Sequence, residues 1–127
     1  MNLILKSTLD DYGIPVLGIV INEKTFPAAI DTGSTGNVMR PDMVSILDLG
    51  APDRFTKASN PMHGSFKPPT YYIEYRLEGR DDVTFRDPFI VMSTQDYPYP
   101  FLLGCDFLIK TKSFTIYGLE RTFEVFL

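Results

Sequence analysis

The sequence is most informative at residues 28–36, which read Ala28-Ala29-Ile30-Asp31-Thr32-Gly33-Ser34-Thr35-Gly36. An acidic residue here follows an apolar stretch directly and opens a loop of small residues. A carboxylate at the end of a buried strand is costly unless hydrogen-bond donors surround it. Gly33 lets the backbone come close, and the hydroxyls of Thr32 and Ser34 can hold the carboxylate oxygens. From this stretch alone two interpretations stay open: a catalytic Asp31, or an aspartate that caps a turn.

A second informative stretch follows about 70 residues later and reads Phe101-Leu102-Leu103-Gly104-Cys105-Asp106-Phe107-Leu108. This pattern predicts an apolar strand, a glycine and then one or two helical turns over Cys105 to Lys110. Between the two stretches, large apolar side chains alternate with exposed ones from Tyr71 to Leu77, which predicts a half-buried strand. Residues Val83 to Met92 predict another strand, which we expect to break near Asp87-Pro88.

The rest of the chain predicts short strands and one further helix, because ten prolines and nine glycines punctuate its 127 residues. Pro27 indicates an edge or irregular position within its strand. The predicted elements are strands at Val16–Ile21 and Thr25–Ile30, a helix from Pro41-Asp42 to Gly50, a hairpin or loop at Phe55–Phe66, and a closing hairpin of Phe114–Tyr117 with Thr122–Leu127. We therefore expect a mostly all-β fold with one or two short helices, in a single domain over residues 1–127.

Composition excludes several classes of protein. The net charge is −4, and the chain contains no long run of charged residues of either sign, which argues against nucleic acid as a partner. A single cysteine, Cys105, excludes an internal disulfide. With only one histidine beside it, the chain has no typical zinc constellation, so we expect no metal and no cofactor. The same lone histidine leaves a serine triad without support.

No segment predicts a membrane span or a signal peptide. The longest apolar stretch, Ile14 to Ile21, contains Pro15 and is too short to cross a bilayer. The first ten residues lack a basic leader and a small-residue cleavage site. The localisation is therefore unassigned, with the cytoplasm favoured and an anchor outside this chain left open.

Together the two stretches resemble the aspartic peptidase superfamily, specifically its single-domain, dimeric retropepsin-like branch. Its first motif is apolar-apolar-Asp-Thr-Gly followed by Ser or Ala, and its second is apolar-apolar-Gly-x-Asp/Asn-apolar-Leu. Both occur here in the right order and near the right spacing, and the resemblance covers about residues 16–127. It implies a closed acid-protease β-barrel that forms one half of the enzyme.

The resemblance also assigns roles to individual residues. Asp31 would be the catalytic aspartate, and Thr32 would join the two active-site loops of a dimer through its hydroxyl. Gly33 would offer its backbone to substrate, and Ser34 would donate a hydrogen bond to an outer carboxylate oxygen. The implied substrate-binding residues are Ala29, Val38, Met62, His63, Gly64, Pro100 and Leu102. Asp106 would belong to the helix that supports the active-site loop, a structural role.

Two departures from the family pattern stand out. Met62 and His63 occupy the expected flap tip, where retroviral members are rich in glycine. The chain also continues into a terminal hairpin where viral members end in a single strand. The dimer interface is therefore expected to differ, and the apolar start Leu3-Ile4-Leu5 would contribute a strand to it or pack against its own core.

The mechanism that the resemblance implies needs two carboxylates, one as general base and one as general acid. Two ionised carboxylates about 3 Å apart repel by about 5 kcal/mol, so such a pair shares one proton. The chain has a single Asp-Thr-Gly, and we expect Asp10-Asp11 and Asp81-Asp82 to be solvated turn residues. A two-fold homodimer would place Asp31 opposite its own copy.

Two functions of different class follow. The first is an aspartic endopeptidase that hydrolyses polypeptides through the Asp31 dyad of a homodimer. The alternative is a catalytically silent peptide-binding or dimerisation module with the same fold. In the first case, the expected Ser34 hydrogen bond predicts a faster rate at about pH 4–5 than at about pH 7.

Overall fold

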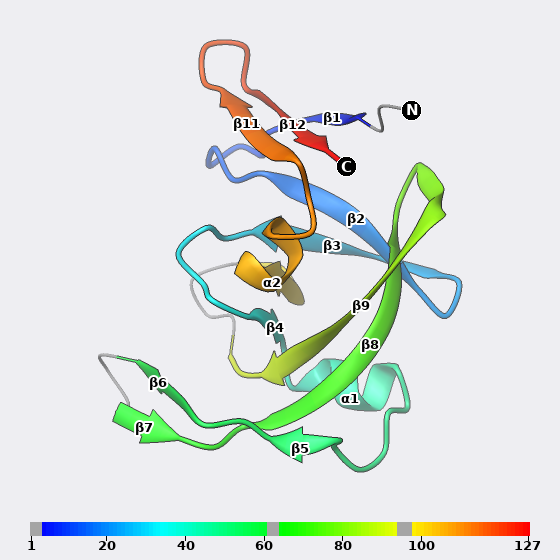
Figure 1. Cartoon of the computed structure of the whole chain (residues 1–127), viewed down its shortest axis with the longest axis vertical. Helices are drawn as coiled ribbons and strands as arrows, with labels where there is room; N and C mark the ends of the chain where they lie inside the picture. Colours follow the sequence, from blue (N-terminus) through cyan, green and yellow to red (C-terminus); the bar gives the residue numbers. More distant parts are fainter. Residues whose placement is uncertain (1–3, 61–63, 94–97) are drawn as a thin grey trace.

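The computed structural model describes residues 4–60, 64–93 and 98–127, and most of them belong to β-strands (Figure 1). The strands are β1 (Ile4–Thr8), β2 (Val16–Ile21), β3 (Lys24–Ile30), β4 (Asn37–Met39), β5 (Arg54–Phe55), β6 (Ala58–Asn60), β7 (Gly64–Phe66), β8 (Pro69–Leu77), β9 (Arg80–Val91), β10 (Phe101–Leu103), β11 (Ser113–Tyr117) and β12 (Thr122–Phe126). The helices are α1 (Asp42–Ile46) and α2 (Cys105–Leu108).

Six strands close into a barrel. Their order is β2-β3-β10-β4-β9-β8, and β2 returns to β8 where Ile19 lies opposite Leu77. β5 extends the sheet beyond β8. The expected closed, mostly β barrel with short helices is therefore confirmed.

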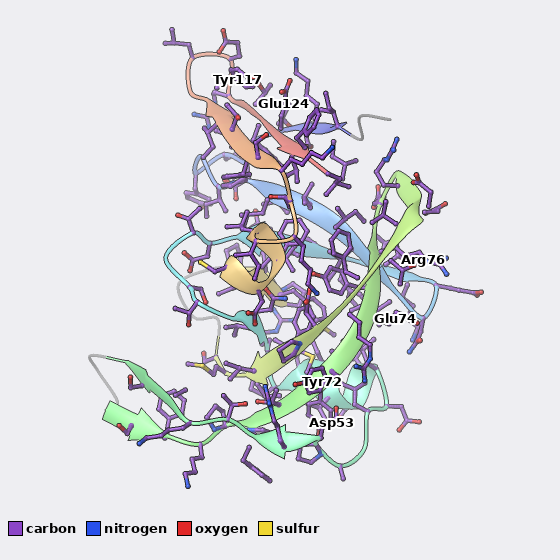
Figure 2. The ribbon with its side chains drawn as sticks, in the orientation of Figure 1. Asp53, Tyr72, Glu74, Arg76, Tyr117 and Glu124 are labelled. Atoms are coloured by element: carbon purple, nitrogen blue, oxygen red, sulfur yellow. The ribbon has the colours of Figure 1, made fainter. Side chains whose placement is uncertain are left out.

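Alternation along the strands explains the interior of this barrel. On β8, the four alternate side chains from Tyr71 to Leu77 are buried, and Tyr72, Glu74 and Arg76 are exposed on its outer side (Figure 2). Successive side chains of a strand point to opposite faces, so this period of two places one face in the core. The predicted half-buried strand is confirmed.

Aromatic rings fill the centre of the barrel. Tyr75 of β8 stacks on Phe85 at 5.3 Å between ring centroids and meets Phe89 edge-on at 5.4 Å. Phe101 meets Phe89 at 5.7 Å, and Phe107 of α2 lies 5.5 Å from Phe85. These edge-on and offset contacts are the arrangements that aromatic rings prefer. They fasten α2, which follows the second motif, to the barrel core.

The prediction of a break at Asp87-Pro88 is wrong. β9 runs without interruption from Arg80 to Val91, with Pro88 opposite Tyr72 of β8. On its other side β9 pairs with β4 only from Phe89 onward. A proline lacks the N–H that a second neighbour would require, and it is tolerated here because that neighbour has not yet begun.

Pro27 is tolerated in β3 for the same reason, in agreement with the edge or irregular position that this proline indicates in the sequence. It lies opposite Gly18 of β2, whereas β10 joins β3 only from Ala28.

The helix after Pro41 is shorter than expected. α1 ends at Ile46 rather than running to Gly50, and the chain turns with Asp48 at φ 52° and Gly50 at φ 70°. Left-handed residues cannot continue a right-handed helix, so they end it.

The expected hairpin at Phe55–Phe66 is present as β6 paired with β7.

Both ends of the chain share a second, three-stranded sheet in the order β1-β12-β11. β1 pairs with β12 of its own chain, from Ile4 opposite Phe126 to Thr8 opposite Thr122. Phe123 and Val125 of β12 are fully buried and belong to the same hydrophobic cluster as the barrel interior. The predicted terminal hairpin is confirmed. Of the apolar stretch at the start, Leu5 packs against the core of its own chain, and Leu3 lies outside the described residues. Among the described residues, no helix has the length and apolarity needed to cross a membrane.

A buried carboxylate joins α2 to the two longest strands. Asp87 of β9 is 2% exposed; it accepts a hydrogen bond of 2.6 Å from the Tyr75 hydroxyl and forms an ion pair with Lys110 just after α2. Lys110 also donates to the carbonyl of Arg86 at 3.1 Å. Burial raises the pKa of Tyr75, and its bond to Asp87 adds to the rise. Both oxygens of the carboxylate are thereby satisfied, as a buried charge requires.

We expect Lys110→Met to lower the free energy of unfolding by about 2 kcal/mol, because it leaves Asp87 buried without its cation. Breaking a fully buried pair costs about 3–5 kcal/mol, and the smaller value reflects the 42% exposure of the Lys110 side chain. Urea unfolding measures the loss. Lys6→Met is a matched control, since Lys6 is 63% exposed in a 3.8 Å pair with Glu124. The control should lose less than about 0.5 kcal/mol, and equal losses would contradict the role given to Asp87.

Candidate active site

Asp31 follows the last residue of β3 and opens the loop of residues 31–36. Its backbone N–H donates to the Leu103 carbonyl of β10 at 2.9 Å, and the N–H of Ile30 donates to the Pro15 carbonyl at 2.9 Å. β3 and β10 run parallel here, with Ile30 opposite Leu103. The first residue of the loop is thus held from both sides by neighbouring backbone.

The loop then folds back on the Asp31 side chain. The Gly33 N–H donates to Oδ1 of Asp31 at 2.9 Å, and the Ser34 N–H donates to the Asp31 carbonyl at 3.2 Å. Asp31 is half-buried, whereas Thr32 and Gly33 are exposed. This geometry orients a carboxylate and keeps it within reach of a second molecule.

The expected bond from Ser34 to the carboxylate is not formed, and this prediction is corrected. The Ser34 hydroxyl donates instead to the Gly36 carbonyl at 2.7 Å. The turn that brings the Ser34 N–H to the Asp31 carbonyl aims the side chain along the loop, toward Gly36. The sequence-based argument that Ser34 makes the activity acidic therefore fails.

The second motif supports this loop from behind. The N–H of Gly104 donates to Oδ1 of Asn37, a fully buried side chain, at 2.9 Å. The N–H of Cys105 donates to the Ser34 carbonyl at 2.8 Å. A Cβ atom on Gly104 would lie only 2.3 Å from the Gly36 carbonyl oxygen. Only glycine therefore lets the start of α2 approach the loop this closely.

Asp106 lies behind the loop, in the first turn of α2. Its Oδ2 would lie 3.5 Å from a Cβ atom on Gly36. Burial raises the pKa of Asp106, and the negative charge of Asp87 adds to the rise. Its position matches the structural role expected of it.

A small apolar cluster lies on the same face as Asp31. Ala29 precedes Asp31 by two residues, Leu102 lies opposite Ala29, and Val38 lies opposite Leu102. Asp31 continues the pairing of β3 with β10 through its N–H, and side chains two apart along a strand share a face. We infer from this alternation that the carboxylate points to the same side as Ala29. These three buried residues form a group distinct from the main core. The structure thus brings together three of the predicted substrate-binding residues, and their role stays a prediction.

Two other predicted substrate-binding residues, Pro100 and Gly64, are described and do not belong to this group. Pro100 is buried, and its carbonyl accepts the N–H of Arg40 at 2.8 Å. Gly64 is exposed at the start of β7, with φ at 68°. Met62 and His63 lie outside the described residues.

Sequence reasoning missed three side chains that pack against the cluster. They are partly buried: Ile14, Met92 and Tyr99. Ile14 lies two residues before the predicted strand, and its apolar character beside Pro15 was a usable signal. Nothing in the sequence connects Met92 or Tyr99 with this site, because their positions depend on how the barrel closes.

Among the described residues, no group of three or more histidine, cysteine or acidic side chains could hold a metal ion.

Comparison with known proteins gives a structural likeness only. No family model matches the chain, and no curated protein does. A retropepsin-like aspartic protease from Rickettsia conorii has a similar structure, with a TM-score of 0.74 and 14% sequence identity over 99% of this chain and 92% of that one. The simian foamy virus (mac) protease matches with a TM-score of 0.52 and 20% identity, over 78% of this chain and 100% of that one. At such identities the likeness concerns the fold, and the chain has the retropepsin-like fold.

We expect Gly104→Ala to destabilise the chain by about 3 kcal/mol, because the new methyl group would overlap two carbonyl oxygens. Those oxygens belong to Gly36 and Ser34, at 2.3 and 2.6 Å from the added Cβ. Gly118→Ala is the control, since no atom lies within 4 Å of its added Cβ. Chemical unfolding of both variants measures the difference. A Gly104→Ala variant as stable as wild type would show that the loop does not depend on this close approach.

Proposed function

We propose that this single domain is one half of an aspartic endopeptidase, and that a second copy of the chain completes the active site. The observation that carries the proposal is the Asp31 carboxylate, oriented by the Gly33 N–H beside an apolar cluster on the same face. The retropepsin-like fold supports it, because two of its solved examples are described as proteases. The substrate is a polypeptide, and neither nucleic acid nor a cofactor takes part.

In the proposed reaction, one Asp31 carboxylate accepts a proton from a water molecule while the partner's Asp31, protonated, donates to the oxygen of the scissile carbonyl. The water oxygen bonds to the carbonyl carbon, which gives a tetrahedral diol. The Asp31 that took the proton from water then donates it to the amine nitrogen as the C–N bond breaks, and one diol hydroxyl returns its proton to the partner's Asp31 as the carbonyl re-forms. General acid and base groups of this kind contribute about 10²–10⁴-fold each to a rate. The pair must hold one proton between them, so the rate falls as rising pH ionises both.

A homodimer is proposed because the described face carries one such carboxylate per chain. Thr32 lies exposed at the tip of the same loop, where its hydroxyl can reach the partner's loop across a two-fold axis. The apolar cluster of Ala29, Val38 and Leu102 then forms part of the floor of the cleft. Such a floor suits apolar substrate side chains on either side of the cleaved bond.

The decisive experiment compares wild type with Asp31→Asn on a diverse peptide mixture from about pH 3 to about pH 8. Asparagine keeps the shape of the side chain but can neither accept nor donate the catalytic proton. Turnover should fall at least about 10³-fold, and wild-type activity should decline on the alkaline side. Mass spectrometry of the products identifies the cuts, and sedimentation of the same samples reports the dimer.

Defined cuts that persist in Asp31→Asn would contradict the proposal. A wild-type dimer that binds peptides and cuts none of them would favour the silent peptide-binding module instead. In that case Asp31→Asn should bind peptides as tightly as wild type does.

Thr32→Val tests the proposed contact between the two loops. Valine keeps the shape of threonine and removes the hydroxyl, so two hydrogen bonds per dimer are lost and the dimer dissociation constant should rise about 10-fold or more. Activity at low protein concentration should fall in parallel and recover at high concentration. Thr32→Ser, which keeps the hydroxyl, should dimerise within about threefold of wild type. Equal dissociation constants for the valine and serine variants would remove Thr32 from the interface.

A further inference from the structure

Asp10 holds a tight loop between β1 and β2. Its Oδ1 accepts the backbone N–H groups of Tyr12 and Ile14, both at 2.8 Å. The Asp10 N–H donates to the Ile14 carbonyl at 2.9 Å, and Gly13 crosses the turn with φ at 80°. Asp10 is a turn residue, as expected, and its carboxylate is also the acceptor that holds the turn together. The geometry of this loop, and the place of Ile14 in it, depend on one carboxylate.

The other oxygen of the same carboxylate reaches a distant segment. Oδ2 of Asp10 accepts the hydroxyl of Tyr99, which lies 89 residues further along the chain. Tyr99 comes just before β10, the strand that pairs with β3 beside Asp31. A charged acceptor makes this a stronger bond than a neutral one would be.

Ile14 and Tyr99 both pack against the apolar cluster at the candidate site. Each is partly buried against Ala29, Val38 and Leu102. Asp10 thus holds Ile14 through the backbone of Ile14, and it holds Tyr99 through the hydroxyl at the end of the Tyr99 side chain. Two neighbours of the cluster, from separate segments, are fixed by one acidic residue that does not itself belong to the cluster.

Asp10 is also bonded to the terminal sheet through its backbone carbonyl. Arg121, in the turn between β11 and β12, donates through its guanidinium to the Asp10 carbonyl at 2.8 Å. Its own carbonyl accepts the N–H of Leu9 at 2.8 Å. The loop that carries Asp10 is therefore held on the side away from the cluster as well.

We propose that Asp10 is a positioning residue for substrate, which sets the place of the Ile14 and Tyr99 walls of the cleft and so the width of an apolar subsite. This inference rests on the proposed function, because it requires a peptide to lie against the cluster. Asp10 touches no reacting atom in it. Its effect is expressed in how tightly and how selectively a peptide binds.

The contacts of Asp10 lower the pKa of its carboxylate. The Tyr99 hydroxyl holds the pKa of Asp10 below its ordinary value of 3.8, and the N–H groups of Ile14 and Tyr12 and the charge of Arg121 add to this effect. The hydrogen bond to Asp10 raises the pKa of Tyr99 to about 12, and burial and the negative charges of Asp10 and Asp11 add to the rise. A lowered carboxylate pKa means that the contacts persist above the ordinary value and are lost only as pH falls through the folded-state value.

The test compares Tyr99→Phe, Asp10→Asn and the double variant on a peptide that wild type cleaves, at about pH 5. Tyr99→Phe should raise KM about fivefold and leave kcat within about twofold, since one hydrogen bond that positions substrate is lost. The double variant should be no worse than Asp10→Asn alone, because both changes break the same contact. Cleavage should also become less selective for the apolar side chain that meets the cluster.

Tyr117→Phe is the matched control. Tyr117 donates to Glu124 at 3.2 Å, also a tyrosine–carboxylate pair, on the exposed side of the terminal sheet (Figure 2). Its loss should leave KM and selectivity as in wild type. The same peptide is also titrated against Asp31→Asn with and without Tyr99→Phe. Affinity should fall about fivefold in this background, where no cleavage takes place.

The outcomes separate the two proposals. A folded, dimeric Tyr99→Phe with wild-type KM and affinity overturns the positioning role, as do strictly additive effects of the two substitutions. If wild type cleaves nothing but Tyr99→Phe weakens peptide binding to Asp31→Asn, the peptidase fails and the positioning role stands. If no peptide binds any variant, both proposals are overturned. Tyr99→Phe leaves all backbone bonds to Asp10 in place, so it decides the matter even where Asp10→Asn unfolds.

Discussion

The close approach of Gly104 to the loop of residues 31–36 is the contact on which the candidate site depends. No side chain separates the two backbones there, and a Cβ atom would overlap the carbonyl oxygens of Gly36 and Ser34. With the loop packed against the start of α2, the Gly33 N–H points to the Asp31 carboxylate. α2 in turn is anchored by Phe107 in the core and by the ion pair of Asp87 with Lys110. The position of the Asp31 carboxylate therefore depends, through the loop and α2, on the packing of the aromatic rings inside the barrel.

Most of the fold could be predicted from the sequence, because strand periodicity and motif order are local signals. The alternation from Tyr71 to Leu77 and the two motifs at residues 28–36 and 101–108 each identified an element that the structure contains. The break expected at Asp87-Pro88 was wrong for a reason of tertiary structure. Whether a proline interrupts a strand depends on whether a neighbour needs its N–H, and pairing partners distant in sequence decide this.

The candidate site was only partly predictable for the same reason. Asp31 and its loop lie in one motif, so their residue types alone suggested chemistry. Ser34 had the right hydroxyl, but the turn aims it at Gly36. Asp10 looked like an ordinary turn acid, since its bond to Tyr99 joins segments 89 residues apart. Interactions of that kind become visible only when the barrel has closed.

The pairing of β1 with β12 gives the chain a definite order of events during synthesis. Residues 4–8 of β1 pair with residues 122–126, so a long stretch of chain must close into a loop before that sheet can form. During synthesis, β1 is without this partner strand until residues 122–126 have emerged from the ribosome. Because this sheet is completed within one chain, the fold does not need a second copy to supply a strand to it. Assembly of the homodimer proposed above would then be a separate, concentration-dependent step, and dilution would leave folded but unpaired chains.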